Sequence, residues 1–202
     1  KLEREGKIPV LPVFVDSPMA IDVTKIYREF RNDFDDDAVA IAKAGQSALY
    51  TERTTFTQTS DQSKALNDLK GPRIIISASG MVNGGRIMHH MMHWLPDEKA
   101  TVLFVGYQAE DTRGRIIQSG APTVRIFGND VPIRAQVEEV SGLSAHGDQN
   151  ELIRWLKSCS GKPSVMRIVH GELDAARAFS ELVKQDLNWQ SQPAKQGEVI
   201  EV

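Results

Sequence analysis

A run of β-branched residues that ends in a glycine-rich loop constrains the fold of this chain more than any other feature. Residues 73–77, RIIIS, lead directly into residues 78–85, ASGMVNGG. An uninterrupted apolar run of this kind is typical of a strand covered on both faces, as in parallel sheets. Parallel strands need crossover connections, which are usually helices. We therefore expect an α/β fold with a mainly parallel sheet flanked by helices.

The neighbouring segments repeat the same order of elements. Residues 10–15 predict a strand, after which Ser17 caps and Pro18 opens a helix to about Arg31. Residues 33–56 give weaker signals, and we expect Asp35–Asp37 to form a solvated helix start. Further helices are expected at residues 60–69, with Ser60 as cap, 86–95, up to 118, 148–157 and 173–188. Further strands are expected at residues 101–106, at 123–127 and 132–140 as a hairpin around GND, and at 165–169 and 198–202.

Composition limits the class of protein. An apolar content of 41% is sufficient for a buried core, and a net charge of −3 excludes a wholly basic surface, so a polyanionic partner would need a local patch. The single cysteine, Cys159, excludes a thiolate-type zinc site. No apolar run approaches the roughly 20 residues that cross a bilayer, and no signal-peptide pattern occurs. We expect a cytoplasmic protein without a membrane partner and, because the chain starts at Lys1 without methionine, a fragment.

The glycine loop after the strand at residues 73–77 has two interpretations. Ser79 offers a hydroxyl, and Gly80 and its neighbours allow a ligand to approach the backbone, so the loop predicts a phosphate contact. The loop is neither a GxGxxG nor a Walker A motif, which argues against a nucleotide cofactor. The alternative, a tight structural turn, stays open.

Five histidines fall into two groups. His89 and His93 are four residues apart on a predicted helix, but His90 occupies the position where a HExxH motif has glutamate, so we interpret these three as helix-surface or interface residues. His146 and His170 each precede a glycine at the end of a predicted strand, where small neighbours leave room for a ligand. Spacing alone leaves open whether these two are structural or share an active site.

Both strand-end histidines are followed two residues later by an acidic residue. Asp148 and Glu172 are therefore candidate partners, because a carboxylate can orient an imidazole. Asp148 can also cap the next helix, with Glu151 three residues on completing a capping box.

Five blocks then identify a resemblance: VDSPMA, IIISASGMVNGGRIMHHM, VLFVGYQAEDTRGR, VSGLSAHGD and VHGE. In this order and at these separations they resemble the β-CASP branch of the metallo-β-lactamase-fold nucleases, which includes ribonuclease J and the pre-mRNA 3′-end cleavage endonuclease. The resemblance covers nearly the whole chain. It implies a β-CASP domain over residues 1–143 and the C-terminal return segment of a metallo-β-lactamase αββα fold over residues 144–202.

The same resemblance implies roles for individual residues. His146 matches the family histidine that contacts the scissile phosphate and is a candidate proton donor, and His170 matches a zinc ligand. The loops at Ser17 and at Ser79, Gly80 and Met81 would face the RNA channel. Asp111 and Arg113 stand where family members often carry Gly and Leu, so this loop would differ in charge and stiffness.

The implied function is that of a zinc-dependent RNA nuclease. Two zinc ions would activate the attacking water and stabilise the developing charge, leaving a 5′-phosphate on the product of endonuclease or 5′-exonuclease cleavage. The expected partners are single-stranded RNA and a second copy of the chain in a homodimer. The alternative is a non-catalytic nucleic-acid-binding module of a pseudo-nuclease.

One departure from the family concerns the metal. The HxHxDH signature, which supplies most zinc ligands, is missing from this sequence. We therefore expect the fragment alone to be inactive and without a complete zinc site, with His146 and His170 close together near the surface. Its return segment is expected to expose apolar surface.

Overall fold

The computed structural model describes residues 2–3, 5–143 and 146–200. The chain divides into two compact units, residues 1–140 and 141–202. Among the described residues, no helix combines the length and apolar character needed to cross a membrane.

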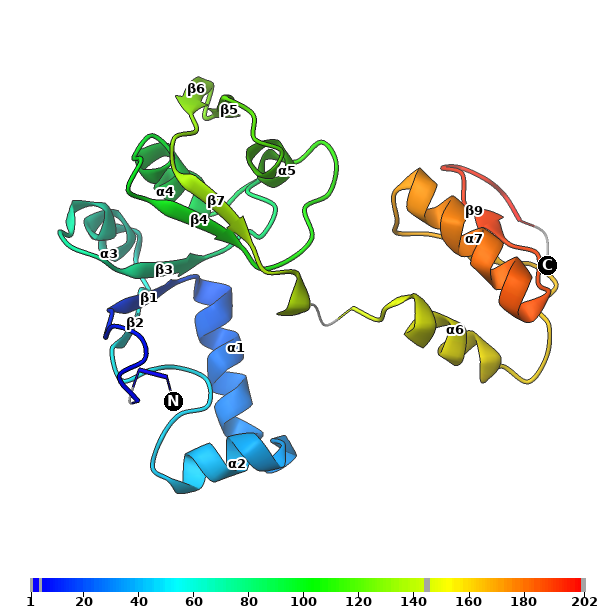
Figure 1. Ribbon diagram of the computed structural model, residues 1–202, viewed down its shortest axis with the longest axis horizontal. Coiled ribbons are helices and arrows are strands. Elements are labelled where there is room, and N and C mark those ends of the chain that lie inside the picture. Colours follow the sequence, from blue (N-terminus) through cyan, green and yellow to red (C-terminus); the bar gives the residue numbers. More distant parts are fainter. Residues whose placement is uncertain (1, 4, 144–145, 201–202) are drawn as a thin grey trace. The chain divides into compact units, whose positions relative to one another are not determined.

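A three-stranded parallel sheet opens the first unit (Figure 1). Strand β1 (Val13–Asp16) lies between β2 (Thr54–Phe56) and β3 (Ile74–Ser77). Helix α1 (Pro18–Glu29) follows β1 directly, because the Ser17 hydroxyl accepts a hydrogen bond from the Ala20 amide at 3.3 Å and Pro18 occupies the first turn. The predicted strand–cap–helix unit is confirmed.

Two further helices, α2 (Asp36–Lys43) and α3 (Ser60–Ala65), precede and follow β2 in the sequence. Asp35 caps α2, which confirms the predicted solvated acidic helix start. Helix α3 begins one residue earlier than expected, because Thr59 and Gln62 form a reciprocal capping box. Ser60 is therefore not the cap, and the helix passes into a 3-10 turn, Leu66–Asp68, instead of continuing to residue 69.

The rest of the first unit contains a second parallel pair. Strand β4 (Thr101–Phe104) pairs with β7 (Gln136–Glu139). The sequence predicted one mainly parallel sheet, and in this respect the prediction is wrong, because β4 and β7 form a pair separate from the β2–β1–β3 sheet. Helices α4 (Ile87–Trp94) and α5 (Arg113–Gln118) precede and follow β4. The core between these elements is formed by buried apolar side chains, the most completely buried of which are Leu95, Ile117, Ile126, Val82 and Val124.

The predicted hairpin exists, but its turn is earlier. Strands β5 (Thr123–Ile126) and β6 (Asn129–Pro132) are antiparallel. Phe127 and Gly128 form the two-residue turn with φ of 48° and 82°, the backbone region that a tight hairpin requires at both positions. Asn129 and Asp130 belong to the strand, so the GND turn and the single strand over residues 132–140 are corrected.

Strands β3 and β4 are less buried than the sequence predicted. The side chains of Ile74 and Ile76 in β3 are 45% and 51% exposed, and Leu103 in β4 is 53% exposed. Successive side chains of a strand point to opposite faces, and here only one face of each strand is covered by the described chain. The prediction of strands buried on both faces is therefore wrong for this chain.

The second unit is built around two helices. Helix α6 (Gln149–Lys157) packs on α7 (Leu173–Leu187) through a small core that includes Ile153, Leu156 and Val183. Strands β8 (Arg167–Ile168) and β9 (Gln192–Pro193) form a short parallel pair. The strand expected at residues 198–202 is wrong over 198–200, which carry no strand, while residues 201–202 lie outside the described part.

Apolar side chains remain exposed on the second unit. Trp155 is 66% exposed, Val169 65% and Leu173 54%. This exposure agrees with the expectation of uncovered apolar surface in the return segment.

Candidate functional site

A buried carboxylate lies where β1 ends. The Asp16 side chain is fully buried and accepts hydrogen bonds from Arg86 Nη1 at 2.7 Å and from the Ser63 hydroxyl at 2.6 Å. His90 Nε2 lies 2.7 Å from the second carboxylate oxygen. A buried charge is tolerated when it is paired and hydrogen-bonded, and Asp16 satisfies both conditions.

This arrangement corrects the interpretation of the helix α4 histidines. His89 and His93 are exposed, as expected, but the His90 side chain is buried between Asp16 and Asn67, with its Nδ1 3.0 Å from Asn67 Oδ1. Arg86, the N-cap residue of α4, and His90 are four residues apart, a spacing that places both on one helix face. That spacing was the available signal, but it does not show that the partner is Asp16, 74 residues earlier.

Arg86 connects the network to the loop after β2. Its guanidinium donates to the backbone carbonyl oxygens of Thr57 at 2.8 Å and Gln58 at 2.7 Å. Burial alone raises the pKa of the Asp16 carboxyl, but the hydrogen bonds from Ser63, His90 and Arg86 and the Arg86 charge outweigh it, so the pKa lies below its ordinary value. The network fixes the carboxyl ends of β1 and β2 relative to α4.

The glycine loop, residues 78–85, follows β3. Ser79 and Met81 are half-buried and Gly80 is exposed. Gly85 is required by the turn itself, since its φ is 76° and a Cβ would lie 2.7 Å from the Ala78 carbonyl oxygen. A Cβ at Gly80 or Gly84 would meet no atom within 4 Å, so the backbone at these two glycines stays accessible. The loop is thus a built turn with an open side, and the phosphate contact remains a prediction.

A second loop, residues 105–112, and the first residues of α5 are bound to the glycine loop. The Gly114 amide donates to the Met81 carbonyl oxygen at 3.0 Å, and the Arg113 amide donates to Asn83 Oδ1 at 3.3 Å. The Ala109 amide points at the Met81 sulfur at 3.4 Å. Met81, expected to contact substrate, therefore also joins the two loops.

A Gly114→Ala variant is expected to lose about 1–3 kcal/mol of unfolding free energy. Its Cβ would lie 1.7 Å from the Gln108 side-chain oxygen and 3.2 Å from the Met81 carbonyl oxygen, so the buried Gln108 must move. Urea denaturation measures the loss. Gly84→Ala is the matched control, because its Cβ meets open space and the change is expected to stay within about 0.5 kcal/mol. Equal stability of the two variants would contradict the packing described here.

Ser17, a further expected channel residue, is only 4% exposed. Its hydroxyl caps α1, and its backbone directly follows Asp16. The structure assigns it this structural contact, and its role toward RNA stays a prediction.

The strand-end histidines lie in the second unit. His146 and His170 are both exposed, and His170 follows β8 with a φ of 65°. An open cavity of about 460 Å³ is lined by His170, Gly171 and Leu173 together with residues of the segment 193–196, and among its described lining residues His146 does not occur. The expected proximity of the two histidines therefore stays a prediction.

The two acidic neighbours have different contacts. Asp148 caps α6, accepting from the Glu151 amide at 2.8 Å, while Glu151 accepts from the Asp148 amide at 3.0 Å, which confirms the predicted capping box. Glu172 is the half-buried N-cap residue of α7, and its side chain makes no capping hydrogen bond. Whether either carboxylate orients an imidazole stays a prediction.

Two known protein families match this chain, one after the other along the sequence. A β-CASP domain matches residues 1–117, and a Zn-dependent metallo-hydrolase RNA specificity domain matches residues 130–192. The chain belongs to the β-CASP family. The parallel sheets flanked by helices agree with that membership and with the expected α/β class.

Curated relatives of this β-CASP chain include two nucleases by name. It is 37% identical over 177 residues to ribonuclease TTHA0252 of Thermus thermophilus and 32% identical over 177 residues to an RNase J-like protein of Methanocaldococcus jannaschii. It is also 30% identical over 179 residues to the transcription termination factor FttA of M. jannaschii. These matches cover 88%, 88% and 86% of the chain but 40%, 39% and 28% of the relatives.

The possible metal ligands of this β-CASP chain are dispersed over the part that the structure describes. Among the described residues, no group of three or more His, Cys, Asp or Glu side chains is arranged to hold a metal ion. A protein zinc site needs three or four such ligands, and the family resemblance assigns only His170 to this role.

Proposed function

We propose that this chain is the β-CASP and C-terminal part of a zinc-dependent nuclease that hydrolyses phosphodiester bonds in single-stranded RNA, as an endonuclease, a 5′-exonuclease or both. The observation that carries the proposal is the ordered match to a β-CASP domain and an RNA specificity domain over residues 1–117 and 130–192. The boundary that we propose between the two parts, after residue 143, borders on residues outside the described part.

The residues of the chain receive the following roles in this proposal. The glycine loop at Ser79–Met81 and the adjacent Ser17 segment face the RNA, and the exposed His146 contacts the scissile phosphate and donates a proton to the leaving oxygen. His170 supplies one zinc ligand, and zinc, when bound, provides an activated water. Asp148 and Glu172 support the two histidines.

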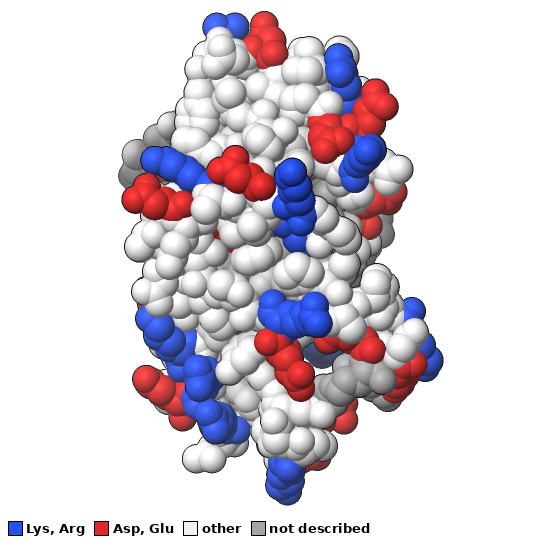
Figure 2. All heavy atoms as spheres, turned by 90° about the vertical axis from the view of Figure 1, so that its left-hand side faces the viewer, with Lys and Arg blue, Asp and Glu red and all other residues white. Residues whose placement is uncertain are grey.

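Surface charge supports local rather than general RNA contact. Lys and Arg side chains alternate with Asp and Glu on the face shown in Figure 2, around an area that carries neither. With a net charge of −3, binding to phosphates must come from particular loops. We further propose that the protein acts in the cytoplasm and as a homodimer.

A cleavage assay with metal removal tests the proposal. The chain is joined to a metallo-β-lactamase half that carries HxHxDH, and a 5′-labelled single-stranded RNA is incubated with it before and after chelation and zinc readdition. Cleavage is expected with zinc, a loss of about 100-fold or more after chelation, and recovery on readdition. Unchanged cleavage after chelation would refute a metal-dependent nuclease.

A non-catalytic nucleic-acid-binding module is the second candidate. It is favoured by the relatives named transcription termination factors, a name that specifies no cleavage. This alternative predicts RNA binding without cleavage by the joined, zinc-loaded protein, so the same assay separates the two.

A further inference from the structure

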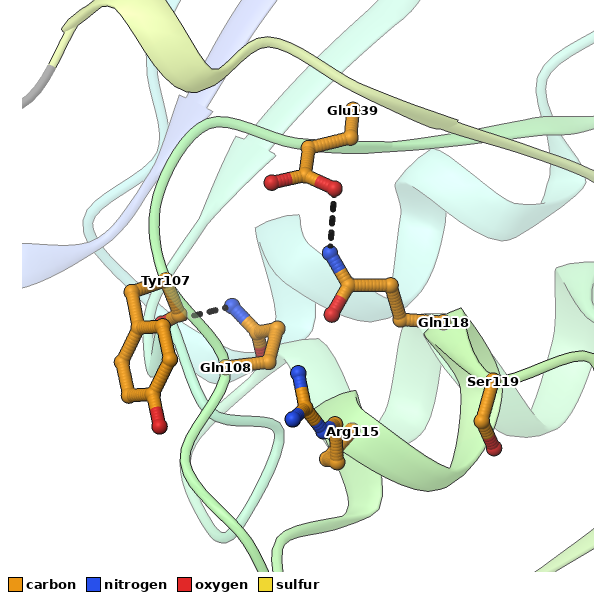
Figure 3. A pocket seen from close by; sticks show the side chains of 6 residues that line it. All are labelled: Tyr107, Gln108, Arg115, Gln118, Ser119 and Glu139. Carbon is orange, nitrogen blue, oxygen red and sulfur yellow. Dashed lines mark hydrogen bonds between the residues drawn. The ribbon is translucent and has the colours of Figure 1, made fainter. Parts of the chain in front are cut away.

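A second polar pocket lies where β4 ends, beside the loop that binds Met81. It has a volume of about 310 Å³ and is lined by Tyr107, Gln108, Arg115, Gln118, Ser119 and Glu139 (Figure 3). This volume is within the range of small-molecule sites. The lining residues come from the loop after β4, from α5 and its end, and from β7.

Gln108 holds the loop in place at this pocket. It is only 3% exposed, and its amide nitrogen donates to the Gly106 carbonyl oxygen at 3.1 Å and to the Tyr107 carbonyl oxygen at 3.3 Å. The other side of its amide packs against Gly114 of α5. The backbone of Tyr107 is therefore fixed, while its side chain remains exposed, with 53% of the residue accessible. Figure 3 shows the Tyr107 ring at the edge of the pocket, on the same side as Arg115.

The other polar side chains that line the pocket include groups of both signs. The Gln118 amide nitrogen donates to Glu139 Oε2 at 2.7 Å, which leaves the Gln118 carbonyl oxygen directed toward the Arg115 guanidinium (Figure 3). Within the described part of the chain, the half-buried Arg115 guanidinium has no side-chain hydrogen bond or ion pair. The pocket thus presents free donors next to an acceptor and a carboxylate.

Mixed polarity argues for a base and against a phosphate. The Glu139 carboxylate, which lines the same pocket as the guanidinium, would repel an anionic phosphate, whereas the edge of a nucleobase offers donors and acceptors together. Aromatic and arginine side chains bind unpaired bases by stacking and by hydrogen bonds to their edges. The pocket also lies next to the proposed RNA-facing loop, because Gly114, adjacent to Arg115, donates to the Met81 carbonyl oxygen.

We propose that this pocket is a subsite for one nucleobase of single-stranded RNA, with the base stacked on Tyr107 and its edge bound by Arg115 and Gln118. The subsite rests on the proposed function, since it presumes that the chain contacts RNA. It deepens that function by assigning a base contact outside the residues that carry the chemistry.

Binding of 5′-fluorescein-labelled decaadenylate to the 202-residue chain, measured by fluorescence anisotropy, tests the subsite. Tyr107→Leu is expected to weaken binding by about 5- to 150-fold, the range for one stacked base, while Tyr107→Phe retains the ring and most of the affinity. Arg115→Gln is expected to weaken binding as well. Arg125→Gln is the matched control, because the Arg125 side chain is 72% exposed on the hairpin and its loss is expected to change affinity less than twofold.

Competition identifies the ligand chemistry. Adenosine is expected to displace the oligonucleotide, and inorganic phosphate at equal ionic strength is not. Displacement by phosphate alone would make the pocket an anion site and overturn the base subsite. Equal affinities of Tyr107→Leu, Tyr107→Phe and the unmodified chain would overturn it too, as would absence of any binding, and the independent cleavage assay then decides whether the nuclease proposal stands.

Discussion

An Asp16→Ala variant is expected to lose about 3–5 kcal/mol of unfolding free energy, the cost of removing one partner from a buried ion pair. The side chain is fully buried, and its loss leaves Arg86, His90 and Ser63 without their common acceptor. Trp94 reports on the first unit because its indole nitrogen donates to Asn67, the other partner of His90, at 3.2 Å. Urea denaturation followed by tryptophan fluorescence, in a background with Trp155→Phe and Trp189→Phe, measures the loss.

Asp22→Ala is the control for removal of a carboxylate. Asp22 also forms an ion pair, with Lys25 at 2.8 Å, but its side chain is 68% exposed. Exposed pairs contribute only about 0–1 kcal/mol, so the control is expected to remain near the unmodified chain. Similar losses for both variants would contradict a special role of the buried network.

The difference in unfolding free energy between the unmodified chain and Asp16→Ala is expected to depend on pH. The pKa of Asp16 is lower in the folded chain than its ordinary value of about 3.9. At acidic pH the folded state therefore binds fewer protons at this group than the unfolded state does. Its stabilising contribution is present above the unfolded-state pKa and is lost as the pH falls through the folded-state pKa. The stability difference between the unmodified chain and Asp16→Ala is therefore expected to be constant above about pH 5 and to narrow below about pH 4. A difference that widens on acidification would contradict this sign.

The second large effect concerns the two strand-end histidines in the joined, zinc-loaded protein. His170→Ala is expected to reduce bound zinc and RNA cleavage together, because a zinc ligand is lost. His146→Ala is expected to lower cleavage by about 10²- to 10⁴-fold with zinc content unchanged, the range for removal of a proton donor. Elemental analysis of the purified variants and single-turnover cleavage of labelled RNA measure the two properties separately.

His93→Ala is the matched control for histidine removal. His93 is exposed on α4 in the first unit, where its ring lies against Trp94 with centroids 4.5 Å apart, and it has no proposed role in metal or RNA binding. Zinc content and cleavage are expected to remain unchanged. Normal cleavage by both His146→Ala and His170→Ala would refute the assigned roles. Loss of zinc by His146→Ala would contradict its role as a proton donor and indicate that it is a zinc ligand instead.

Local signals predicted most of the elements. Ser17 before Pro18, and Asp148 three residues before Glu151, are capping patterns whose partners lie within one helical turn, so the sequence contains the whole interaction. The hairpin turn was misplaced because Phe127 takes a positive φ that a bulky residue rarely adopts, while the neighbouring Asn129 suggested a turn. The burial of β3 and β4 was overestimated, because an apolar run in the sequence does not show whether other segments pack on both faces of the strand.

The sequence predicted some residues of the candidate site and missed others, because only some of them belong to local motifs. Ordered motifs located the glycine loop, His146 and His170, and they identified the family. Neither the burial of His90 nor the polar pocket around Tyr107 and Arg115 follows from local spacing, since each joins residues distant in the chain.

The sequence by itself determined the α/β class, the helix starts and the β-CASP membership, because these depend on periodicity, capping and ordered motifs within short segments. Only the tertiary structure decided which polar groups share a site. Asp16 meets Arg86 and His90 across 70 and 74 residues, and Gln118 meets Glu139 across 21. Such pairs depend on how strands and helices pack, and a buried charge selects its partners by the free-energy cost of leaving it unpaired.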